Sequence, residues 1–358
     1  MSFMKNKNII ILGAGLCGLT LAYLLRNSNY QITVIEARNR LGGRILTKNT
    51  SGETPIDLGP AWLWNQNTNL LNLLKELEIP IHQQFATGNA YYQSMASQPP
   101  QLFQLPENQE PSYRMAGGTN SIIKKLSSIL SSIDLKLNEP VLNLEENVHL
   151  IDVKTSQSTY QADLVVSTIP PGLLVNNIEF TPNLPDSLVN IANNTHTWMA
   201  DSIKFGLSYD KPFWKEKGLS GSCFSNVGPF TELYDHTNYN ENRFALAGFM
   251  KPAISDLSSS QRKKMILNQL EDFLGKEALD FISYEEQCWA QEKFTRAQNH
   301  DLLSPHQNNG HSAYNHLYFN NKLIISGTET ASQYAGYMEG AVRRAQFVFE
   351  FLDNLKVS

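Results

Sequence analysis

Three glycines and one acid near the start of the chain have the types and spacing of a dinucleotide-binding site. Gly13, Gly15 and Gly18 follow a short apolar run, and Glu36 lies at the distance from them that a ribose-binding carboxylate requires. In such a motif the first glycine permits a tight turn, the second lets a pyrophosphate approach the backbone, and the third lets a helix pack closely against a strand. We therefore expect phosphates at the positive end of the helix that follows.

The elements that must position these residues appear in order along the chain. Residues 9–12 predict a strand, and residues 16–26 predict an amphipathic helix. Residues 31–35 predict a second, buried parallel strand that ends on Glu36. This order of strand, glycine turn, helix, strand and acid favours a bound dinucleotide over a βαβ unit that binds no ligand.

A second glycine motif follows the acid. Gly42 and Gly43 stand directly before Arg44. A glycine pair permits close approach of the backbone to a ligand, and the guanidinium offers a planar positive fork for phosphate oxygens. A simple nicotinamide-binding fold does not need this additional element.

Residues 36–44, together with residues 57–62 and 323–343, resemble the flavin-containing amine oxidases, the family of monoamine and polyamine oxidases. The resemblance implies FAD, not NAD, as the bound dinucleotide. It implies an α/β fold with a Rossmann-type FAD-binding domain in three segments and a mixed-sheet α+β substrate domain. The FAD-binding segments would be 1–81, 113–172 and 288–358, and the substrate domain would comprise 82–112 and 173–287. The helices that the family inserts between Tyr92 and Arg114 are missing. The resemblance therefore says least about the shape of the substrate pocket.

The resemblance also assigns roles residue by residue. Val141 matches the adenine end of the cofactor site, Glu329 matches an acid near the ribityl and pyrophosphate groups, and the helix after Gly336 would face the isoalloxazine ring. The residues expected at the cofactor are Gly13, Ala14, Gly15, Cys17, Gly18, Glu36, Ala37, Arg38, Gly43, Arg44, Gly59, Pro60, Ala61, Trp62, Val141, Trp289, Gly327, Glu329, Gly336, Tyr337, Met338 and Ala341.

Lys204 and Tyr337 are the residues that the resemblance assigns to catalysis. Lys204 aligns with a lysine that holds a water beside the reactive flavin nitrogen, where a cation would assist reaction with oxygen. Alternation along residues 203–209 places Lys204 on the face opposite Phe205, which also suits an ordinary solvated lysine.

Tyr337 matches one wall of the aromatic pair that holds the amine in this family. The position of the second wall carries Asn299, so another ring, such as Trp62 or Phe294, must substitute if the amine is to be enclosed. The expected substrate residues are therefore Trp62, Phe294, Asn299 and Tyr337. Gln298 stands where covalent relatives carry a cysteine, which implies non-covalent FAD.

Composition excludes several other classes of protein. The net charge is −5 and the isoelectric point is near 5.9, which argues against a nucleic-acid partner. Three widely spaced cysteines indicate a reducing, cytoplasmic compartment. No cluster has the spacing of metal ligands, although His306, His311 and His316 share a polar stretch that we expect at the surface. No later apolar run is long enough for a membrane anchor.

These features predict an FAD-dependent oxidoreductase that oxidises a small-molecule amine to an imine by hydride transfer to the flavin, with oxygen as the acceptor that regenerates the flavin and yields hydrogen peroxide. Asn299 and the missing helices leave open a second possibility, an oxidase, dehydrogenase or desaturase of a non-amine substrate that uses oxygen or another electron acceptor. A third possibility is an FAD-binding accessory protein without turnover.

Overall fold

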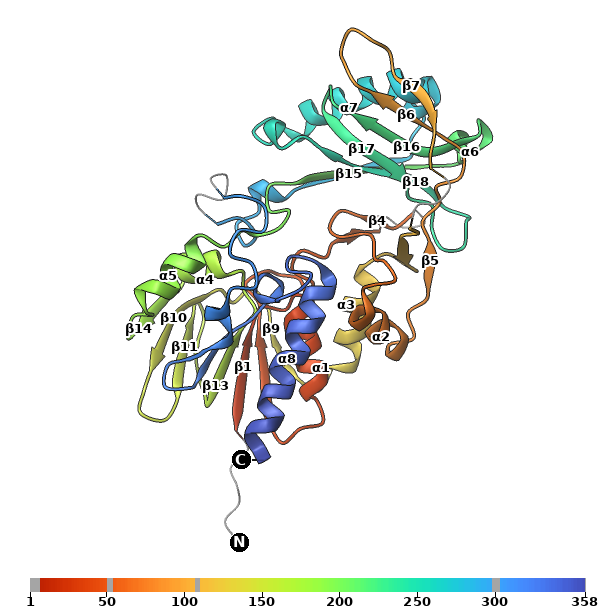
Figure 1. The fold of residues 1–358 in the computed structure, drawn as a ribbon. Coiled ribbons are helices and arrows are strands. Elements are labelled where there is room, and N and C mark those ends of the chain that lie inside the picture. Colours follow the sequence, from red (N-terminus) through yellow and green to blue (C-terminus); the bar gives the residue numbers. More distant parts are fainter. Residues whose placement is uncertain (1–6, 50–53, 107–109, 298–302, 358) are drawn as a thin grey trace.

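The computed structural model describes residues 7–49, 54–106, 110–297 and 303–357. Two sheets dominate the molecule (Figure 1): a largely parallel sheet flanked by helices in one half, and a curved sheet of long strands in the other half. The sequence prediction of an α/β fold with a separate mixed sheet is confirmed.

The parallel sheet has six strands in the order β20-β21-β13-β1-β2-β9, and only β20 runs antiparallel to its neighbour. Its strands are β1 (Asn8–Leu12), β2 (Gln31–Ile35), β9 (Asp134–Lys136), β13 (Leu164–Ser167), β20 (Leu317–Tyr318) and β21 (Leu323–Ile325). Side chains of β1 alternate between two cores, because Ile9 and Ile11 pack on one face and Ile10 and Leu12 on the other.

Helices cover the first face of this sheet. They are α1 (Leu16–Leu25), α2 (Thr68–Glu76), α3 (Asn120–Ile129) and α8 (Met338–Val357), and α8 lies along α1 in Figure 1. The sequence predicts an amphipathic helix over 16–26, but nine of the ten residues of α1 are buried. The prediction was wrong because α1 packs between the sheet, α3 and α8, so it has no solvent face to keep polar.

A four-stranded sheet covers the second face. Its strands are β10 (Val141–Glu146), β11 (Ile151–Thr155), β12 (Thr159–Ala162) and β14 (Glu179–Thr181), and the helices α4 (Pro171–Asn177) and α5 (Asp186–Asn193) lie beside it. The sequence predicts residues 173–193 in the substrate domain, and here the structure differs. Strand β14 pairs with β10, and Leu174 and Leu188 belong to the core of this half. After this segment the chain enters the sheet of the second half with β15 (Ile203–Tyr209).

The second half is built on a seven-stranded sheet in the order β19-β15-β18-β17-β16-β6-β7. Its strands are β6 (Asn89–Gln93), β7 (Gln101–Gln104), β15 (Ile203–Tyr209), β16 (Leu219–Ser225), β17 (Phe230–Asp235), β18 (Phe244–Met250) and β19 (Ser283–Cys288). The helix α7 (Ser259–Leu274), which begins with a capping box at Ser258 and Gln261, packs its apolar side on one face. The other face turns toward the parallel sheet and carries Lys204.

Short elements connect the two halves. The remaining strands and helix are β3 (Thr47–Lys48), β4 (Ile56–Asp57), β5 (Ile81–Gln83), β8 (Tyr113–Met115) and α6 (Phe213–Glu216), and the 3₁₀ turns are Pro252–Ile254, Lys276–Leu279, Trp289–Gln291, Ser312–Asn315 and Thr328–Thr330. Strand β4 lies against the inner face of the large sheet, where Ile56 and Leu58 pack on Ala245 and Ala247. This contact brings the segment 57–62 to Lys204.

Candidate functional site

The glycine turn between β1 and α1 has the geometry that its spacing predicts. Gly13 adopts a φ of 99°, and a Cβ at this position would stand 2.8 Å from Oγ1 of Thr168. A Cβ on Gly18 would lie only 2.0 Å from the carbonyl oxygen of Gly13, so helix and turn can pack this closely only with glycine. Gly15 forms a parallel bridge with Gly42 and lies against Gly43, which joins the two glycine motifs at one place.

Glu36 is held at this turn by the backbone. Its Oε2 accepts a hydrogen bond from the Ala14 N–H (2.8 Å) and its Oε1 accepts one from the Arg38 N–H (2.9 Å). The carboxylate is buried, yet each oxygen can accept a further hydrogen bond. The N-terminus of α1 beside it has no side-chain cap. A free helix N-terminus, two glycine backbones in contact and a fixed carboxylate together fit the pyrophosphate and ribose of a dinucleotide.

Arg44 has a protein partner that the sequence does not predict. Its guanidinium pairs with both carboxylate oxygens of Glu329, at 2.6 and 2.9 Å, and also donates to the carbonyl oxygen of Trp198 at 3.1 Å. These contacts do not use all five N–H groups of the guanidinium, so the predicted contact with phosphate oxygens stays a prediction. This pair joins the second glycine motif to the closing segment of the chain, so Arg44 holds the site together.

The closing segment brings its residues to the same place. Gly327, which follows β21, has a φ of 115° and lies against the backbone of Thr168, close to the first glycine turn. Met338 and Ala341 are buried at the start of α8 and pack in the same core as α1. Glu339 accepts hydrogen bonds from the backbone N–H groups of Asn69 and Leu70, so it caps the start of α2.

Lys204 is buried, not solvated as an ordinary strand lysine would be. Only 2% of its surface is exposed, and its Nζ donates to the carbonyl oxygen of Gly59 at 2.8 Å. The ring centroids of Trp62 and Phe249 lie 5.0 and 4.9 Å from Nζ. Trp62 is held in turn by a hydrogen bond from its Nε1 to Gln84 (2.9 Å). The structure thus unites Lys204, Gly59 and Trp62, three residues that the sequence singles out.

Burial lowers the pKa of Lys204 from its usual value near 10.5 to about 8, although the Asp57 carboxylate partly opposes this shift and Arg114 adds to it. Asp57 is itself buried and accepts hydrogen bonds from the Thr47 hydroxyl and the Thr119 N–H. An amine with this pKa is charged at neutral pH and becomes neutral just above it. Perturbed values of this kind are typical of functional groups.

Two rings that the sequence does not single out for the site surround Tyr337. His306 stacks on Trp198 with 4.2 Å between ring centroids, and Tyr337 lies 5.9 Å from His306 with its plane tilted by 19°. Trp198 and Tyr337 are 5.6 Å apart. The stretch that contains His306 is expected as a surface excursion, and nothing in its polar composition points to this contact.

The other predicted residues take varied places. Phe294 lies near Arg38, whose Nε pairs with Glu292 at 2.8 Å and whose backbone N–H donates to Glu36. Phe294 thus lies on the Glu36 side of the site and not in the ring cluster of Tyr337. Trp289 is buried and donates from Nε1 to the carbonyl oxygen of Leu58 at 2.7 Å. Gln298 and Asn299 lie outside the described residues.

Cys17, Val141 and several neighbours are positioned by packing. Burial raises the pKa of the Cys17 thiol to about 11, so the sulfur stays protonated beside Ser326 at neutral pH. A protonated thiol is unreactive, so packing explains this residue better than redox chemistry. Val141 begins β10 and is buried near Glu139, whose N–H donates to the carbonyl oxygen of Glu36. Pro60, Ala61 and Ala37 belong to the segments that carry Trp62 and Arg38.

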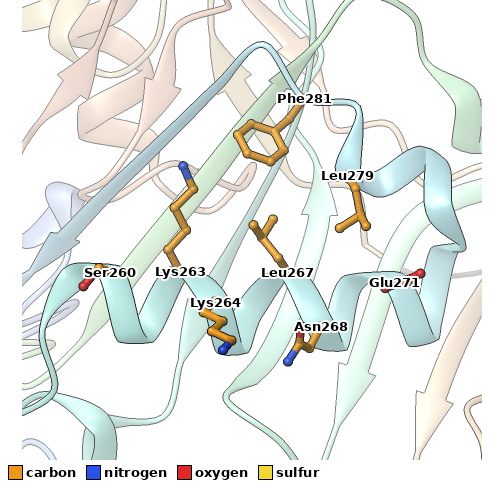
Figure 2. A pocket seen from close by; sticks show the side chains of 8 residues that line it. All are labelled: Ser260, Lys263, Lys264, Leu267, Asn268, Glu271, Leu279 and Phe281. Carbon is orange, nitrogen blue, oxygen red and sulfur yellow. The ribbon is translucent and has the colours of Figure 1, made fainter.

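A cavity of about 400 Å³ lies elsewhere, on the outer side of α7. Figure 2 shows its lining, which includes Lys263, Leu267 and Phe281. The seven-stranded sheet separates this hollow from Lys204, because α7 packs on the opposite face of that sheet. The hollow is therefore distinct from the candidate site.

Among residues 7–49, 54–106, 110–297 and 303–357, no group of three or more His, Cys, Asp or Glu side chains is arranged to hold a metal ion. Within the same ranges no helix has the length and apolar character needed to cross a bilayer.

Comparison with known proteins agrees with this geometry. The model of the family described as "Flavin containing amine oxidoreductase" matches residues 82–348, and the model of an NAD(P)-binding Rossmann-like domain matches residues 11–77. The chain is 28% identical to "Probable flavin-containing monoamine oxidase A" of Dictyostelium discoideum, over 64% of this chain and 50% of that protein. It is 23% identical to putrescine oxidase of Kocuria rosea, over 86% of this chain and 87% of that protein.

A solved structure of putrescine oxidase bound to putrescine shares the fold. Its TM-score is 0.83, with 22% identity over 98% of this chain and 99% of that chain. The glycine turn, the fixed Glu36 carboxylate and the family match thus lead to one assignment: the chain belongs to the flavin-containing amine oxidoreductase family and is an FAD-dependent oxidoreductase.

Proposed function

We propose that the chain binds FAD non-covalently and oxidises an amine to an imine, with hydride passing from the carbon that bears the nitrogen to the flavin and oxygen regenerating the flavin to give hydrogen peroxide. The observation that carries this proposal is the buried Lys204 amine, fixed by Gly59 and two aromatic rings. A preorganised charge of this kind stabilises negative charge that develops during a reaction. Tyr337 supplies a ring face for the substrate nitrogen.

An anaerobic titration tests the proposed reaction. Purified holoprotein would be mixed with primary, secondary and polyamines while the flavin absorbance is followed, and air would then be admitted with a peroxide assay. Bleaching by one amine class followed by peroxide supports amine oxidation. Bleaching without peroxide indicates another electron acceptor. Bleaching by dithionite alone contradicts the amine proposal and favours a non-amine substrate or an accessory role.

Non-covalent attachment of FAD has a separate test. Gln298 cannot form the thioether that a cysteine forms, so acid precipitation is expected to release all of the yellow chromophore into the supernatant. Flavin that stays with the precipitated polypeptide would contradict this expectation. The free flavin would be identified as FAD by its mobility against FAD and FMN standards.

The large sheet suggests what the far end of the substrate carries. Glu232 on β17 lies opposite Phe249 on β18, and Phe249 lies opposite Lys204 on β15. The three residues form one row across the inner face of the sheet. Because neighbouring strands are about 4.8 Å apart, the backbones of Glu232 and Lys204 are about 10 Å apart. The Tyr234 hydroxyl donates to Oε2 of Glu232 at 2.9 Å and leaves the other oxygen available.

This row suits a diamine. The ring centroid of Trp62 lies 5.1 Å from that of Tyr234 and 6.1 Å from that of Phe249. An aromatic surface therefore connects Lys204 with Glu232. A carbon chain can lie on such rings while a distal ammonium pairs with Glu232. We therefore propose a short diamine, with its reacting nitrogen near Lys204 and Tyr337 and its second nitrogen at Glu232.

Glu232→Gln is expected to lower kcat/KM for a diamine by about 10- to 100-fold, since a hydrogen bond to a charged group contributes about 1.5–3 kcal/mol. The value for a monoamine of equal length should change less than about threefold. Glu285→Gln is the matched control, because Glu285 stands on the same face opposite Gly206 but in the edge strand β19. Equal losses for both substrates would show that Glu232 does not recognise the distal cation.

A further inference from the structure

We propose that Asp57 and Arg114 are positioning residues for Lys204, whose charge they control in opposite directions. The carboxylate of Asp57 holds the lysine in its charged form, and the guanidinium of Arg114 opposes this. The inference rests on the proposed function, because it concerns the lysine that carries that proposal. The family resemblance covers residues 57–62, but it gives neither of the two residues a role in the site. Both side chains are buried.

The first step is the backbone that brings Asp57 to Lys204. Strand β4 lies against β15, where a Cβ on Gly206 would stand 2.5 Å from Cγ2 of Ile56. Glycine at this position therefore permits the close approach of the two strands. Two residues after Asp57, the carbonyl oxygen of Gly59 accepts the hydrogen bond from Nζ of Lys204 at 2.8 Å. Asp57 thus belongs to the segment that directly contacts the lysine.

The second step is what the Asp57 carboxylate does for the fold. Its Oδ1 accepts three hydrogen bonds, one from the hydroxyl of Thr47 at 2.5 Å and two from the N–H and hydroxyl of Thr119 at 2.9 Å. Its Oδ2 accepts no hydrogen bond from the described residues and lies 3.5 Å from Nε2 of His236. One amide oxygen would accept the same three hydrogen bonds. The fold therefore does not explain why a negative charge, which is costly to bury, stands here.

The third step is that His236 does not neutralise this charge. Its Nε2 accepts the backbone N–H of Asp57 at 3.1 Å, so this nitrogen carries no proton. Burial and the charge of Arg114 lower the pKa of His236 to about 3, although the Asp57 carboxylate opposes them. The imidazole is therefore neutral at physiological pH. The cations that act on Asp57 are then Arg114 and Lys204.

The fourth step is that two buried cations share one carboxylate. The guanidinium of Arg114 donates to the carbonyl oxygens of Thr237 (2.9 Å) and His236 (3.4 Å), and its Nε has no partner among the described residues. Burial is the main cause of the low pKa of Lys204, which Asp57 raises and Arg114 lowers. Charges act on one another more strongly across a buried region than across water. Removal of either charge should therefore change the protonation of Lys204.

Other charged groups that face Lys204 do not contribute to this shift. Glu232 lies in the same row but two strands away, and Glu285 lies on the edge strand β19 opposite Gly206. Neither changes the pKa of Lys204. The residues directly opposite the lysine in the neighbouring strands are Phe249 and Gln287, which carry no charge. The two residues of the proposal are therefore the ones to substitute.

Asp57→Asn removes the negative charge and keeps the hydrogen bonds. The new amide matches the carboxylate in size, its oxygen can accept from Thr47 and Thr119, and its nitrogen would face Nε2 of His236 in place of Oδ2. The variant is expected to lower the pKa of Lys204 from about 8 to below about 7, because loss of a nearby negative charge disfavours the charged amine.

Arg114→Gln removes the opposing charge. Glutamine can still donate to a backbone carbonyl, and the variant is expected to raise the pKa of Lys204 to above about 8.5. Thr47→Val is the matched control, because it removes a hydrogen bond to Asp57 and keeps both charges. We expect this control to lower Tm but to leave the pKa of Lys204 at about 8.

The first readout does not require turnover. FAD-loaded protein labelled with ¹³C at the ε-carbon of lysine would be titrated with base while NMR spectra are recorded. The signal that is absent from Lys204→Met belongs to Lys204, and its change with pH gives the pKa. A lower value in Asp57→Asn and a higher value in Arg114→Gln support the proposal. A value of about 8 in both variants overturns it.

The second readout is the rate at which reduced flavin reacts with oxygen. At pH 8, Asp57→Asn should be about fivefold slower than the wild type, because the charged fraction of Lys204 falls from about one half to about one tenth. At pH 6 the two rates should agree within about twofold, because the lysine is charged in both proteins. Recovery in acid separates loss of charge from a structural defect, which acid would not repair.

The two readouts separate the present inference from the proposed reaction. If the Lys204 signal shifts as expected but the oxygen rate has no step in pH, the proposed action of Lys204 fails and the coupling of charges stands. If the wild-type rate has a step near pH 8 that neither variant moves, the reaction stands and the coupling is overturned. If Asp57→Asn does not fold, Arg114→Gln decides, and an unmoved Lys204 titration in that variant overturns the proposal.

Discussion

Gly15→Ala is expected to weaken FAD binding by about 100-fold while the protein remains folded. The backbone of Gly15 has a φ of −77° and a ψ of −177°, which alanine adopts without strain, and the nearest atom to an added Cβ, outside the adjoining residues, is Cα of Gly43 at 3.9 Å. The protein itself therefore leaves room for the methyl group. A pyrophosphate bound at the N-terminus of α1 leaves no room for this methyl group. The methyl group would separate the pyrophosphate from two or more backbone N–H donors.

The measurement is a titration of apoprotein with FAD, followed by quenching of flavin fluorescence, beside thermal melts with and without the cofactor. Gly18→Ala is the matched control, since its Cβ would stand 2.0 Å from the Gly13 carbonyl oxygen and must distort the turn itself. We expect Gly18→Ala to lower Tm by several degrees with or without FAD, and Gly15→Ala to lower Tm only in the presence of FAD. Unchanged FAD affinity in Gly15→Ala would remove this turn from the cofactor site.

Lys204→Met is expected to slow the reaction of reduced flavin with oxygen by about 100-fold and to change reduction by the amine less than about threefold. Methionine has a similar length and flexibility and fills the space between Trp62 and Phe249 without charge. The variant therefore removes the positive charge more than it removes packing. Loss of one preorganised stabilising group typically costs a factor of 100 to 1,000 in rate.

The rate of the oxygen reaction is also expected to depend on pH in a definite direction. Lys204 is charged below its pKa of about 8 and neutral above it. In the wild type the oxygen reaction should thus be fast below pH 8 and fall as pH rises through about 8, whereas the methionine variant should show no step there. Stopped-flow mixing of reduced protein with oxygenated buffer measures the rate directly. Lys215→Met, which alters a partly exposed lysine of the same half, is the control.

Equal slowing of both half-reactions in Lys204→Met would remove the lysine from the oxygen step and leave it a structural role. A wild-type profile without a step near pH 8 would show that the charge of Lys204 does not act in that reaction. Either result can be obtained with any amine found to reduce the flavin, so the test does not depend on the diamine proposed above.

Some parts of the site follow from short stretches of sequence. The turn at Gly13 and Gly18, the helix after it and the strand that ends on Glu36 form as predicted, because steric limits on φ and ψ and hydrogen bonds between near neighbours determine them. The strand alternation at residues 203–209 also places Lys204 on the correct face. These features depend on residues within one or two elements.

Other parts depended on how distant elements pack. The sequence could not show that α1 is enclosed on all sides, that residues 173–193 join the first half, or that Glu329 would pair with Arg44. Each outcome depends on which element becomes a neighbour.

The sequence by itself thus determined the family, the bound dinucleotide and the local geometry of its glycine turn. Only the tertiary structure decided which rings stand beside Tyr337, and that Glu232, Phe249 and Lys204 share one row. The physical reason is that backbone sterics and local hydrogen bonds act between residues close in the chain. They therefore produce regular residue spacings that are recognisable in the sequence. Ring stacking and strand register join residues far apart in the chain, and they exist only once the sheets have assembled.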